Sequence, residues 1–199
     1  MAELTGSKKK LALSALDLFA ERGFSGTAIR DIANATGLSL SNIYHHFGNK
    51  EGLLLAILEE ASRRVVANLR EVSDQAGDPL ENFKLLIKSH LQLSCLMNKE
   101  SKIFFLDEEQ LSPEGHQANL KYQREILDIY RGQLRRLQEA GVVSFKSATI
   151  AAFNILGVVN WHLRWYQPEG QMSFDEVSEE VVAFILHGIG GQPAGGIGK

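Results

Sequence analysis

Apolar residues recur along this chain at the spacing of a helix face, and almost no segment alternates as a β-strand would. The first such face comprises Leu11, Ala12, Ala15, Leu16 and Phe19. Two helix starts are explicit, because 78–81 (DPLE) and 173–176 (SFDE) each place a capping residue three positions before a glutamate. The pattern predicts an all-α fold of about nine helices.

Composition narrows the class of protein. With 44% hydrophobic and 23% charged residues, the chain has the balance of a globular domain. Its lone cysteine, Cys95, has no partner for an internal disulfide, which favours a reducing, cytoplasmic compartment. The longest apolar run, 148–161, contains two asparagines and is shorter than the ~20 residues of a membrane span. We therefore expect no membrane segment. The net charge is -3, but residues 1–50 carry six basic residues against four acidic ones.

A short N-terminal segment has the spacing of a helix-turn-helix. This motif needs a small residue where two helices cross, a turn residue that tolerates positive φ four places later, and a branched apolar anchor beyond it. Ala33, Gly37 and Ile43 stand at these offsets, and Thr27 is expected to cap the first of the two helices. The same spacing fits an unrelated helical hairpin, so it does not decide between the two.

The longer string 27–54, TAIRDIANATGLSLSNIYHHFGNKEGLL, resembles the signature of TetR-family regulators. Two positions depart from it: Ser41 stands where glycine is usual, and Gly52 lies inside the start of the next helix. The resemblance implies a three-helix DNA-binding domain over 1–50 and a helical ligand-binding and dimerisation domain over 51–189. A Gly-rich tail, 190–199, is expected to be disordered. The implied function is a repressor that a small effector releases from a palindromic operator. Neither enzyme activity nor a cofactor is predicted.

The predicted DNA contacts lie on the second helix of the motif. Residues at the start of such a helix face base edges in the major groove, and these are Leu40, Ser41 and Asn42. Asn42 can form two hydrogen bonds to an adenine, and Leu40 can contact a thymine methyl group. The family resemblance adds phosphate contacts from Thr27, Ser39, Tyr44, His45, His46 and Lys50.

Two expectations concern individual side chains in this set. Replacing Lys50 with alanine should weaken binding to every operator and lower the salt slope by about one unit. Adjacent histidines such as His45 and His46 raise the question of a metal site. However, adjacent helical residues diverge by about 100° and do not readily share one ion. No metal is predicted.

The last two long helical segments, 148–161 and 177–189, are apolar nearly all round. Such helices must be buried on two sides. In a chain of this size, one side meets the domain core and the other meets the same helices of a second copy. The sequence thus predicts a homodimer through these helices, whose two DNA-binding helices span one turn of the duplex.

Aromatic and polar residues in the second half form the expected effector site. Apolar stripes at helical spacing form any core, so the polar residues among them carry more information, because they need partners once buried. The predicted ligand contacts are His90, Ser94, Phe104, Phe105, Tyr122, Trp161, Arg164 and Trp165.

Residues 160–170, followed by the capped helix start at Ser173, resemble a pattern in TetR-like repressors of fatty-acid, sterol and aromatic-acid catabolism. Several of those proteins respond to acyl-CoA thioesters, which is the effector class implied here. Arg164, Lys99 and Lys102 are candidates for the CoA phosphates.

Three alternatives stay open. A multidrug-type sensor repressor of an efflux gene would use acidic groups such as those at 107–109. A thioesterase-like enzyme would use Ser94 or Cys95 with His90, but the sequence offers no orienting acid for them. The third alternative is a DNA-binding activator or architectural protein.

Overall fold

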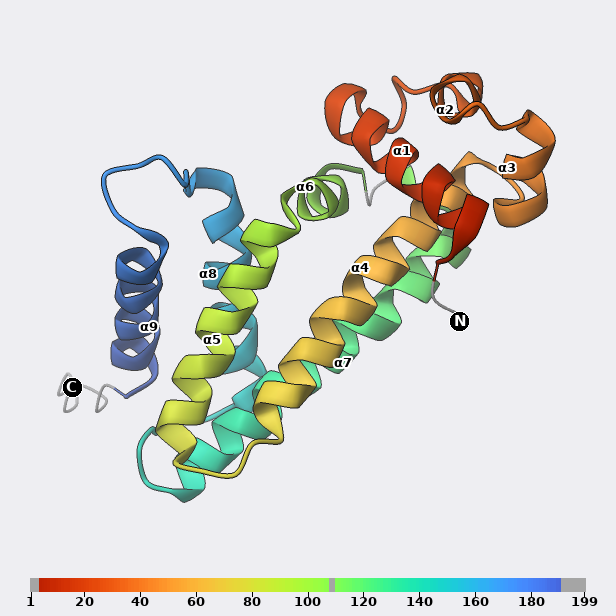
Figure 1. Cartoon of the computed structure of the whole chain (residues 1–199). Helices are drawn as coiled ribbons and strands as arrows, with labels where there is room; N and C mark the ends of the chain where they lie inside the picture. The colour runs from red at the N-terminus through yellow and green to blue at the C-terminus, as the bar shows by residue number, and fades with distance from the viewer. Residues whose placement is uncertain (1–3, 108–109, 191–199) are drawn as a thin grey trace, which may run out of the picture. The chain divides into compact units, whose positions relative to one another are not determined.

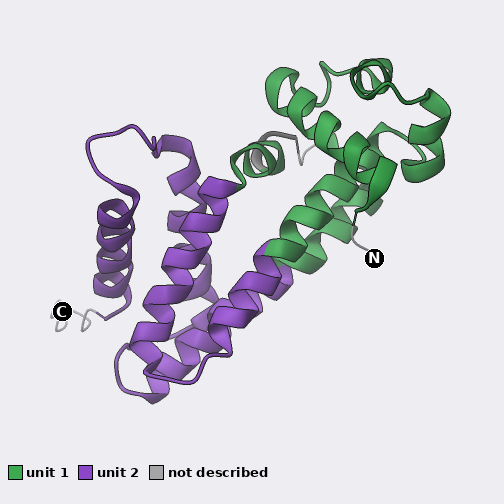
Figure 2. Ribbon diagram, viewed as in Figure 1, with its two compact units in different colours: residues 1–64, 97–123 green, residues 65–96, 124–199 purple. Residues whose placement is uncertain are grey.

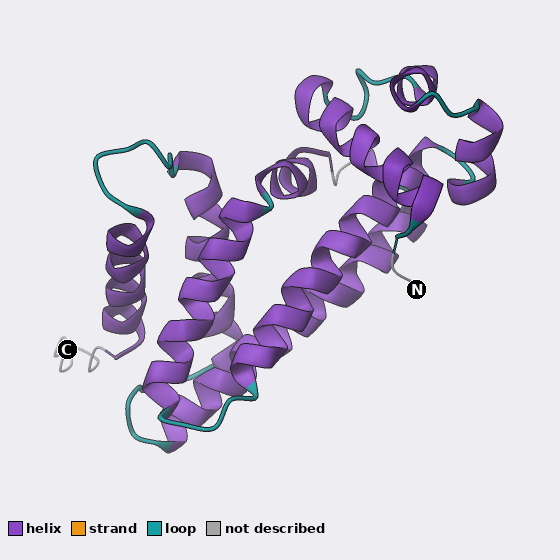
Figure 3. Ribbon diagram, viewed as in Figure 1, coloured by secondary structure: helices purple, strands orange, loops and turns teal. Residues whose placement is uncertain are grey.

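The structure, a computed structural model, describes residues 4–107 and 110–190, with the side chains of 105–107 left out (Figure 1). These ranges contain helices and loops and no strand, as Figure 3 shows, so the predicted all-α fold is confirmed. No helix in them is long and apolar enough to cross a membrane. The helices are α1 (Gly6–Arg22), α2 (Ile29–Thr36), α3 (Leu40–Phe47), α4 (Lys50–Ser73), α5 (Pro79–Leu96), α6 (Asn98–Asp107), α7 (Pro113–Glu139), α8 (Ala148–Trp165) and α9 (Phe174–Gly190).

The chain forms two compact units, which Figure 2 colours separately. Unit 1 comprises residues 1–64 and 97–123, and unit 2 comprises residues 65–96 and 124–199. The N-terminal helices therefore form a unit together with α6 and with the first parts of α4 and α7. The domain boundary expected at residue 50 stays a prediction, and residues 191–199 of the expected tail lie outside the described residues.

Unit 1 has a core made by short-range and long-range contacts. Leu11 and Phe19 of α1, Ile32 of α2 and Ile43 of α3 are buried together. Ile103 of α6 is buried in the same cluster, far from the others along the chain. Because buried apolar area is the main source of stability, α6 belongs to the packing of this unit.

Polar contacts at the ends of helices also tie unit 1 together. The Lys99 ammonium of α6 lies 2.6 Å from the Asp17 carboxylate of α1. The Lys102 ammonium donates to the Ala20 carbonyl oxygen at 2.8 Å. Just before α7, the hydroxyl and the main-chain N–H of Ser112 donate to the Glu51 carboxylate, and these bonds lower the pKa of Glu51. Because these bonds are partly exposed to solvent, they fix the positions of the helices in unit 1 more than they add to the stability of the protein.

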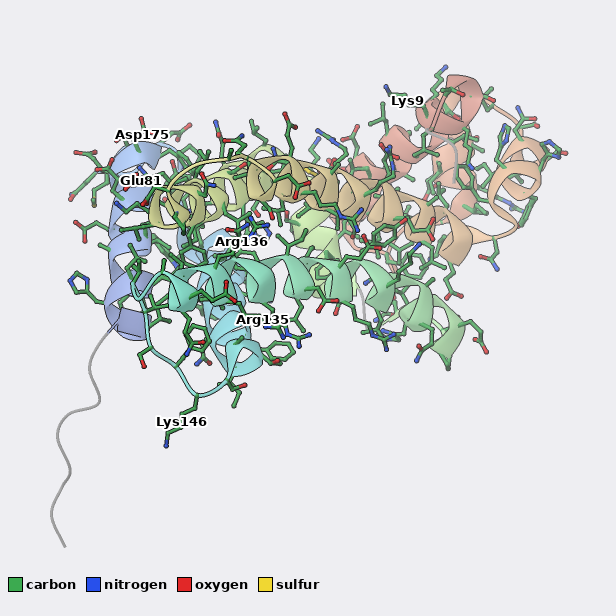
Figure 4. The ribbon with its side chains drawn as sticks, turned by 90° about the horizontal axis from the view of Figure 1, so that it is seen from below. Lys9, Glu81, Arg135, Arg136, Lys146 and Asp175 are labelled. Carbon is green, nitrogen blue, oxygen red and sulfur yellow. The ribbon has the colours of Figure 1, made fainter. Side chains whose placement is uncertain are left out.

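Unit 2 is organised around α5, which packs against α8 and α9. Phe83 and Leu91 of α5, Tyr130 and Leu134 of α7, and Val159 of α8 are fully buried in one cluster. At the edge of this unit, the Arg136 guanidinium of α7 donates to the Ser73 carbonyl oxygen at the end of α4 (Figure 4). That bond satisfies one of the carbonyl groups that a helix end leaves unpaired.

Both predicted helix starts have a side-chain cap, but only the one at α9 is a reciprocal capping box, because the Glu81 carboxylate pairs with Lys84. Asp78 accepts hydrogen bonds from the main-chain N–H groups of Leu80 and Glu81, and α5 begins at Pro79. At α9, the Ser173 hydroxyl accepts from the Glu176 N–H, and the Glu176 carboxylate accepts from the Ser173 N–H. The latter bond lowers the pKa of Glu176.

Candidate nucleic-acid interface

The turn between α2 and α3 has the geometry that the sequence predicts. Gly37 ends α2 with φ 67° and ψ 16°, in the left-handed region. The Thr36 hydroxyl lies 3.0 Å from the Ile32 carbonyl oxygen and accepts from the Leu38 N–H. The Ser39 hydroxyl then accepts from the Asn42 N–H, so α3 begins at Leu40, three residues after the left-handed glycine.

One face of α3 is anchored and the opposite face is open. Ile43 is completely buried against α1 and α2, whereas Ser41, Tyr44 and His45 are exposed. Asn42 is partly exposed, with its side-chain carboxamide at the start of the helix. This arrangement leaves the first turn of α3 accessible to a duplex, as base readout requires.

Leu40 is less accessible than its neighbours. Its side chain is partly buried against the core of unit 1, so part of it packs inward. Contact between Leu40 and a thymine methyl group stays a prediction for the exposed remainder of the side chain.

Thr27 does not cap α2 as the sequence predicted, and its phosphate contact stays a prediction. The residue at the N-cap position of α2 is Ala28, and its N–H donates to the Asp31 carboxylate. No threonine hydroxyl caps this helix. Thr27 is buried, and its hydroxyl lies within hydrogen-bond distance of the carbonyl oxygens of Gly23 (2.9 Å) and Leu18 (3.2 Å). The hydroxyl proton is therefore engaged inside the protein, because a threonine has only one to donate.

Lys50 also contacts the protein itself. Its ammonium group donates to the carbonyl oxygens of Phe24 (2.9 Å) and Thr27 (3.0 Å), and it lies 4.2 Å from the centre of the Phe24 ring. Two of its three N–H donors are thus used to hold the connection between α1 and α2. A phosphate contact through the third donor stays a prediction.

The first turn of α1 supports the end of α3, which the sequence analysis missed. The Ser7 hydroxyl lies 3.0 Å from Nε2 of His46, and the Lys8 ammonium lies 5.6 Å from the centre of the Phe47 ring. The rings of His45 and His46 meet edge-on at 5.2 Å. No local pattern links positions 39 residues apart, so only the fold could reveal these contacts.

The predicted effector contacts are divided between the two units. Phe104 and Tyr122 belong to unit 1, where Phe104 packs partly against the core. His90, Ser94, Trp161, Arg164 and Trp165 belong to unit 2, and the side chain of Phe105 lies outside the described residues.

His90 is one of two fully buried histidines in unit 2. Its Nδ1 lies 2.9 Å from the hydroxyl of Tyr130, which is also completely buried. Burial lowers the pKa of His90 to about 4 and raises that of Tyr130. The pair is therefore neutral and satisfies its own hydrogen bond.

Trp161, Arg164 and Trp165 do not line the interior of unit 2. The two tryptophans are 63% and 51% exposed, and the Arg164 guanidinium lies 5.9 Å from the centre of the Trp161 ring. The buried face of α8 instead comprises Ala151, Ala152, Ile155, Val159 and His162. Ligand contacts by these three residues stay predictions, and the apolar pattern of α8, which runs nearly all round, does not say which side of the helix faces the core.

Lys99 and Lys102 are likewise engaged in unit 1, with Asp17 and with the Ala20 carbonyl. Their predicted role at a CoA phosphate is not supported by these contacts.

Helices α1 to α3 form a three-helix domain in which the second helix of the helix-turn-helix, α3, is exposed. The rest of the described chain is also helical. These features define a helix-turn-helix DNA-binding regulator. Comparison with known families specifies which kind. The family model "Bacterial regulatory proteins, tetR family" matches residues 13–57, and "Tetracyclin repressor-like, C-terminal domain" matches residues 76–189. The chain belongs to the TetR family of bacterial transcription regulators, which are not enzymes.

Similar proteins cover nearly the whole chain. The transcriptional repressor KstR2 of Rhodococcus jostii is 27% identical over 190 residues, 93% of this chain and 92% of the relative. Among solved structures, the TetR-family regulator PfmR of Thermus thermophilus has a TM-score of 0.81 at 30% identity, covering 92% of this chain and 99% of its own. AibR, solved with isovaleryl coenzyme A and operator DNA, has a TM-score of 0.79 at 25% identity, covering 88% and 96%.

Proposed function

We propose that this protein is a repressor that binds a palindromic operator as a homodimer and leaves it when an acyl-CoA thioester binds. The observation that carries the DNA-binding part is the helix α3, which is buried through Ile43 and exposed through Ser41, Tyr44 and His45. The relative KstR2 is a transcriptional repressor, and AibR binds both operator DNA and isovaleryl coenzyme A.

Dimerisation is supported by the outer face of α8 and α9. Monomeric proteins rarely leave a row of large apolar side chains in water. On α8 the large exposed apolar residues are separated by three, eight and four positions, which places them on one side of the helix. The exposed apolar residues of the two helices are Ile150, Phe153, Trp161, Trp165 and Phe184.

A dimer would allow the protein to contact both halves of a palindromic operator. Two copies related by a two-fold axis present two α3 helices, and a palindromic duplex offers two equivalent half-sites one helical turn apart. A ligand that binds more tightly to a dimer with a different α3 spacing shifts the population away from the operator-bound state.

The DNA-binding part is tested by selecting binding sites from random duplexes and titrating the best one by fluorescence anisotropy. Asn42→Ala should weaken binding by ~1–3 kcal/mol at adenine-containing positions and leave binding to a random duplex unchanged. Gln92→Ala, which removes an exposed carboxamide from α5, is the control and should bind like the parent. Equal binding by the Asn42 variant and the parent would refute the assignment of this face to DNA.

The effector part needs a separate measurement. The protein bound to its selected duplex is titrated with isovaleryl-CoA and hexanoyl-CoA, with free CoA as the control. A thioester should release the DNA without being hydrolysed, whereas a falling thioester concentration would indicate an enzyme. Retention of DNA at saturating concentrations of both thioesters would refute the proposed effector class.

A further inference from the structure

His162 is a fully buried side chain in α8 that has no hydrogen-bond partner in the part of the chain that the structure describes. Its exposed fraction is zero, and both Nδ1 and Nε2 lack a partner. The ring stacks on Tyr166 at a centroid distance of 4.7 Å and meets the Trp165 ring edge-on at 5.2 Å. Tyr166 in turn meets Phe174 edge-on at 6.1 Å. The histidine therefore stands among aromatic rings with two unused polar atoms.

This is costly for a folded protein. A neutral imidazole has one N–H donor and one nitrogen acceptor, and each loses its bond to water on burial. The same unit meets this requirement at its other fully buried histidine, because Nδ1 of His90 bonds to Tyr130. Sequences rarely retain a buried polar group without a partner unless something outside the chain supplies one.

The helices packed against α8 offer few polar groups that could form a hydrogen bond with His162. The inner face of α8 meets α5 and α9. The polar groups buried on those helices are His90 and Ser94 on α5 and Ser178 on α9. His90 is bonded to Tyr130, and the Ser178 hydroxyl donates to the Asp175 carbonyl oxygen. Burial also lowers the pKa of His162, so the ring is neutral near pH 7.

We propose that the N–H of His162 donates a hydrogen bond to the acyl carbonyl oxygen of the effector. This inference rests on the acyl-CoA effector proposed above and adds the residue that holds the reactive end of the acyl group. The aromatic neighbours suit an apolar chain attached to that carbonyl. A free carboxylate fits poorly, because it would bring a negative charge into apolar surroundings beside a neutral ring. The site thus favours a thioester over the corresponding acid.

The test compares His162→Leu and His162→Gln with the parent, and uses His116→Leu in unit 1 as the control for loss of a histidine. Leucine has a similar volume and no polar atoms, whereas glutamine retains a donor. The melting temperature of each protein is measured without ligand. Each protein bound to its selected duplex is then titrated with isovaleryl-CoA, hexanoyl-CoA and the two free acids, and the release of DNA is measured.

We expect His162→Leu to raise the melting temperature of the ligand-free protein by a few degrees, because two unpaired polar atoms are removed. The same variant should need at least tenfold more thioester to release DNA. His162→Gln should keep most of the response, and the free acids should be inactive on every protein. A residue needed only for packing would not give higher stability together with a lost response.

Three outcomes would overturn the inference. A lower melting temperature for His162→Leu would mean that the ring already has a partner, such as a buried water. An unchanged thioester response in that variant would remove His162 from the site and leave the proposed effector intact. A parent protein that no thioester releases would refute the proposed effector class, and with it the ligand assigned to His162.

Discussion

Lys50 shows how one side chain can position a DNA-binding helix from outside it. Its ammonium, at the start of α4, holds the carbonyl oxygens of Phe24 and Thr27, which lie in the connection leading into α2. Charge-assisted hydrogen bonds of this kind are stronger than neutral ones, and the adjacent Phe24 ring adds a cation–π contact. Loss of Lys50 would therefore loosen the approach to α2 as well as remove a positive charge.

His90 makes the stability of the protein depend on pH. Its pKa is about 4 in the folded chain and about 6.5 when unfolded, so the unfolded chain binds the proton more readily. Stability is complete above pH 6.5 and decreases as the pH falls from 6.5 towards 4, by about 1.4 kcal/mol per unit and roughly 3 kcal/mol in total. Urea unfolding at pH 7.5, 5.5 and 4.5 measures this decrease.

His90→Gln is the matched variant, because glutamine can bond to Tyr130 and has no proton to gain. Its unfolding free energy should change less over the same range. Three other groups are present in both proteins. His162, whose pKa is also lowered by burial, contributes a loss of stability in the same direction below pH 6.5, and the carboxylates of Glu51 and Glu176, whose pKa values are lowered by hydrogen bonds, contribute only near and below pH 4.5. Parallel pH profiles for parent and variant would show that His90 is not the cause.

At the scale of elements, the turn between α2 and α3 depends on Gly37. Its φ of 67° lies in the left-handed region, although a Cβ there would meet no other atom. Gly37→Ala should therefore destabilise the protein by about 1–2 kcal/mol through backbone strain alone, and urea unfolding would measure the loss. Gly132→Ala, in the interior of α7 with open space and ordinary φ, should stabilise the protein by about 0.5–1 kcal/mol. The same sign for both variants would contradict this account of the turn.

Gly52 shows a different constraint at the start of α4. A Cβ at this position would lie 2.0 Å from the carbonyl oxygen of Phe47, the last residue of α3. The Gly52 N–H also donates to the Asn49 side chain at 2.7 Å. What the sequence shows as a departure from the family pattern is therefore a close approach between the end of one helix and the start of the next.

For the whole molecule, the proposed dimer interface is the outer face of α8 and α9. Phe184 is 67% exposed on α9, so a charge there is tolerated in a monomer and costly inside an interface. Phe184→Glu should give a monomer in sedimentation analysis and lower operator affinity at least tenfold, because one copy contacts only one half-site. Leu96→Glu, at a residue that is 75% exposed on α5, is the control and should remain dimeric. A Phe184→Glu protein that still sediments as a dimer would place the interface elsewhere.

The local structure of this protein follows from its amino-acid sequence alone. Helix faces, capping boxes and a left-handed glycine depend on residues within a few positions of one another, so the all-α fold and the helix-turn-helix could be predicted from spacing. The resemblance of 28 consecutive residues to a family signature also allowed DNA binding to be predicted.

Which side of each helix faces the core depends on packing between segments that are distant in the sequence. The pattern of α8 is apolar nearly all round, so spacing did not reveal that Trp161 and Trp165 point outward while His162 is buried. The engagement of Thr27 and Lys50 with main-chain carbonyls, and the contact of Ser7 with His46, likewise depend on chain segments brought together by folding. Such contacts leave no periodic trace, because the partners are distant in sequence and are set by packing of the whole unit.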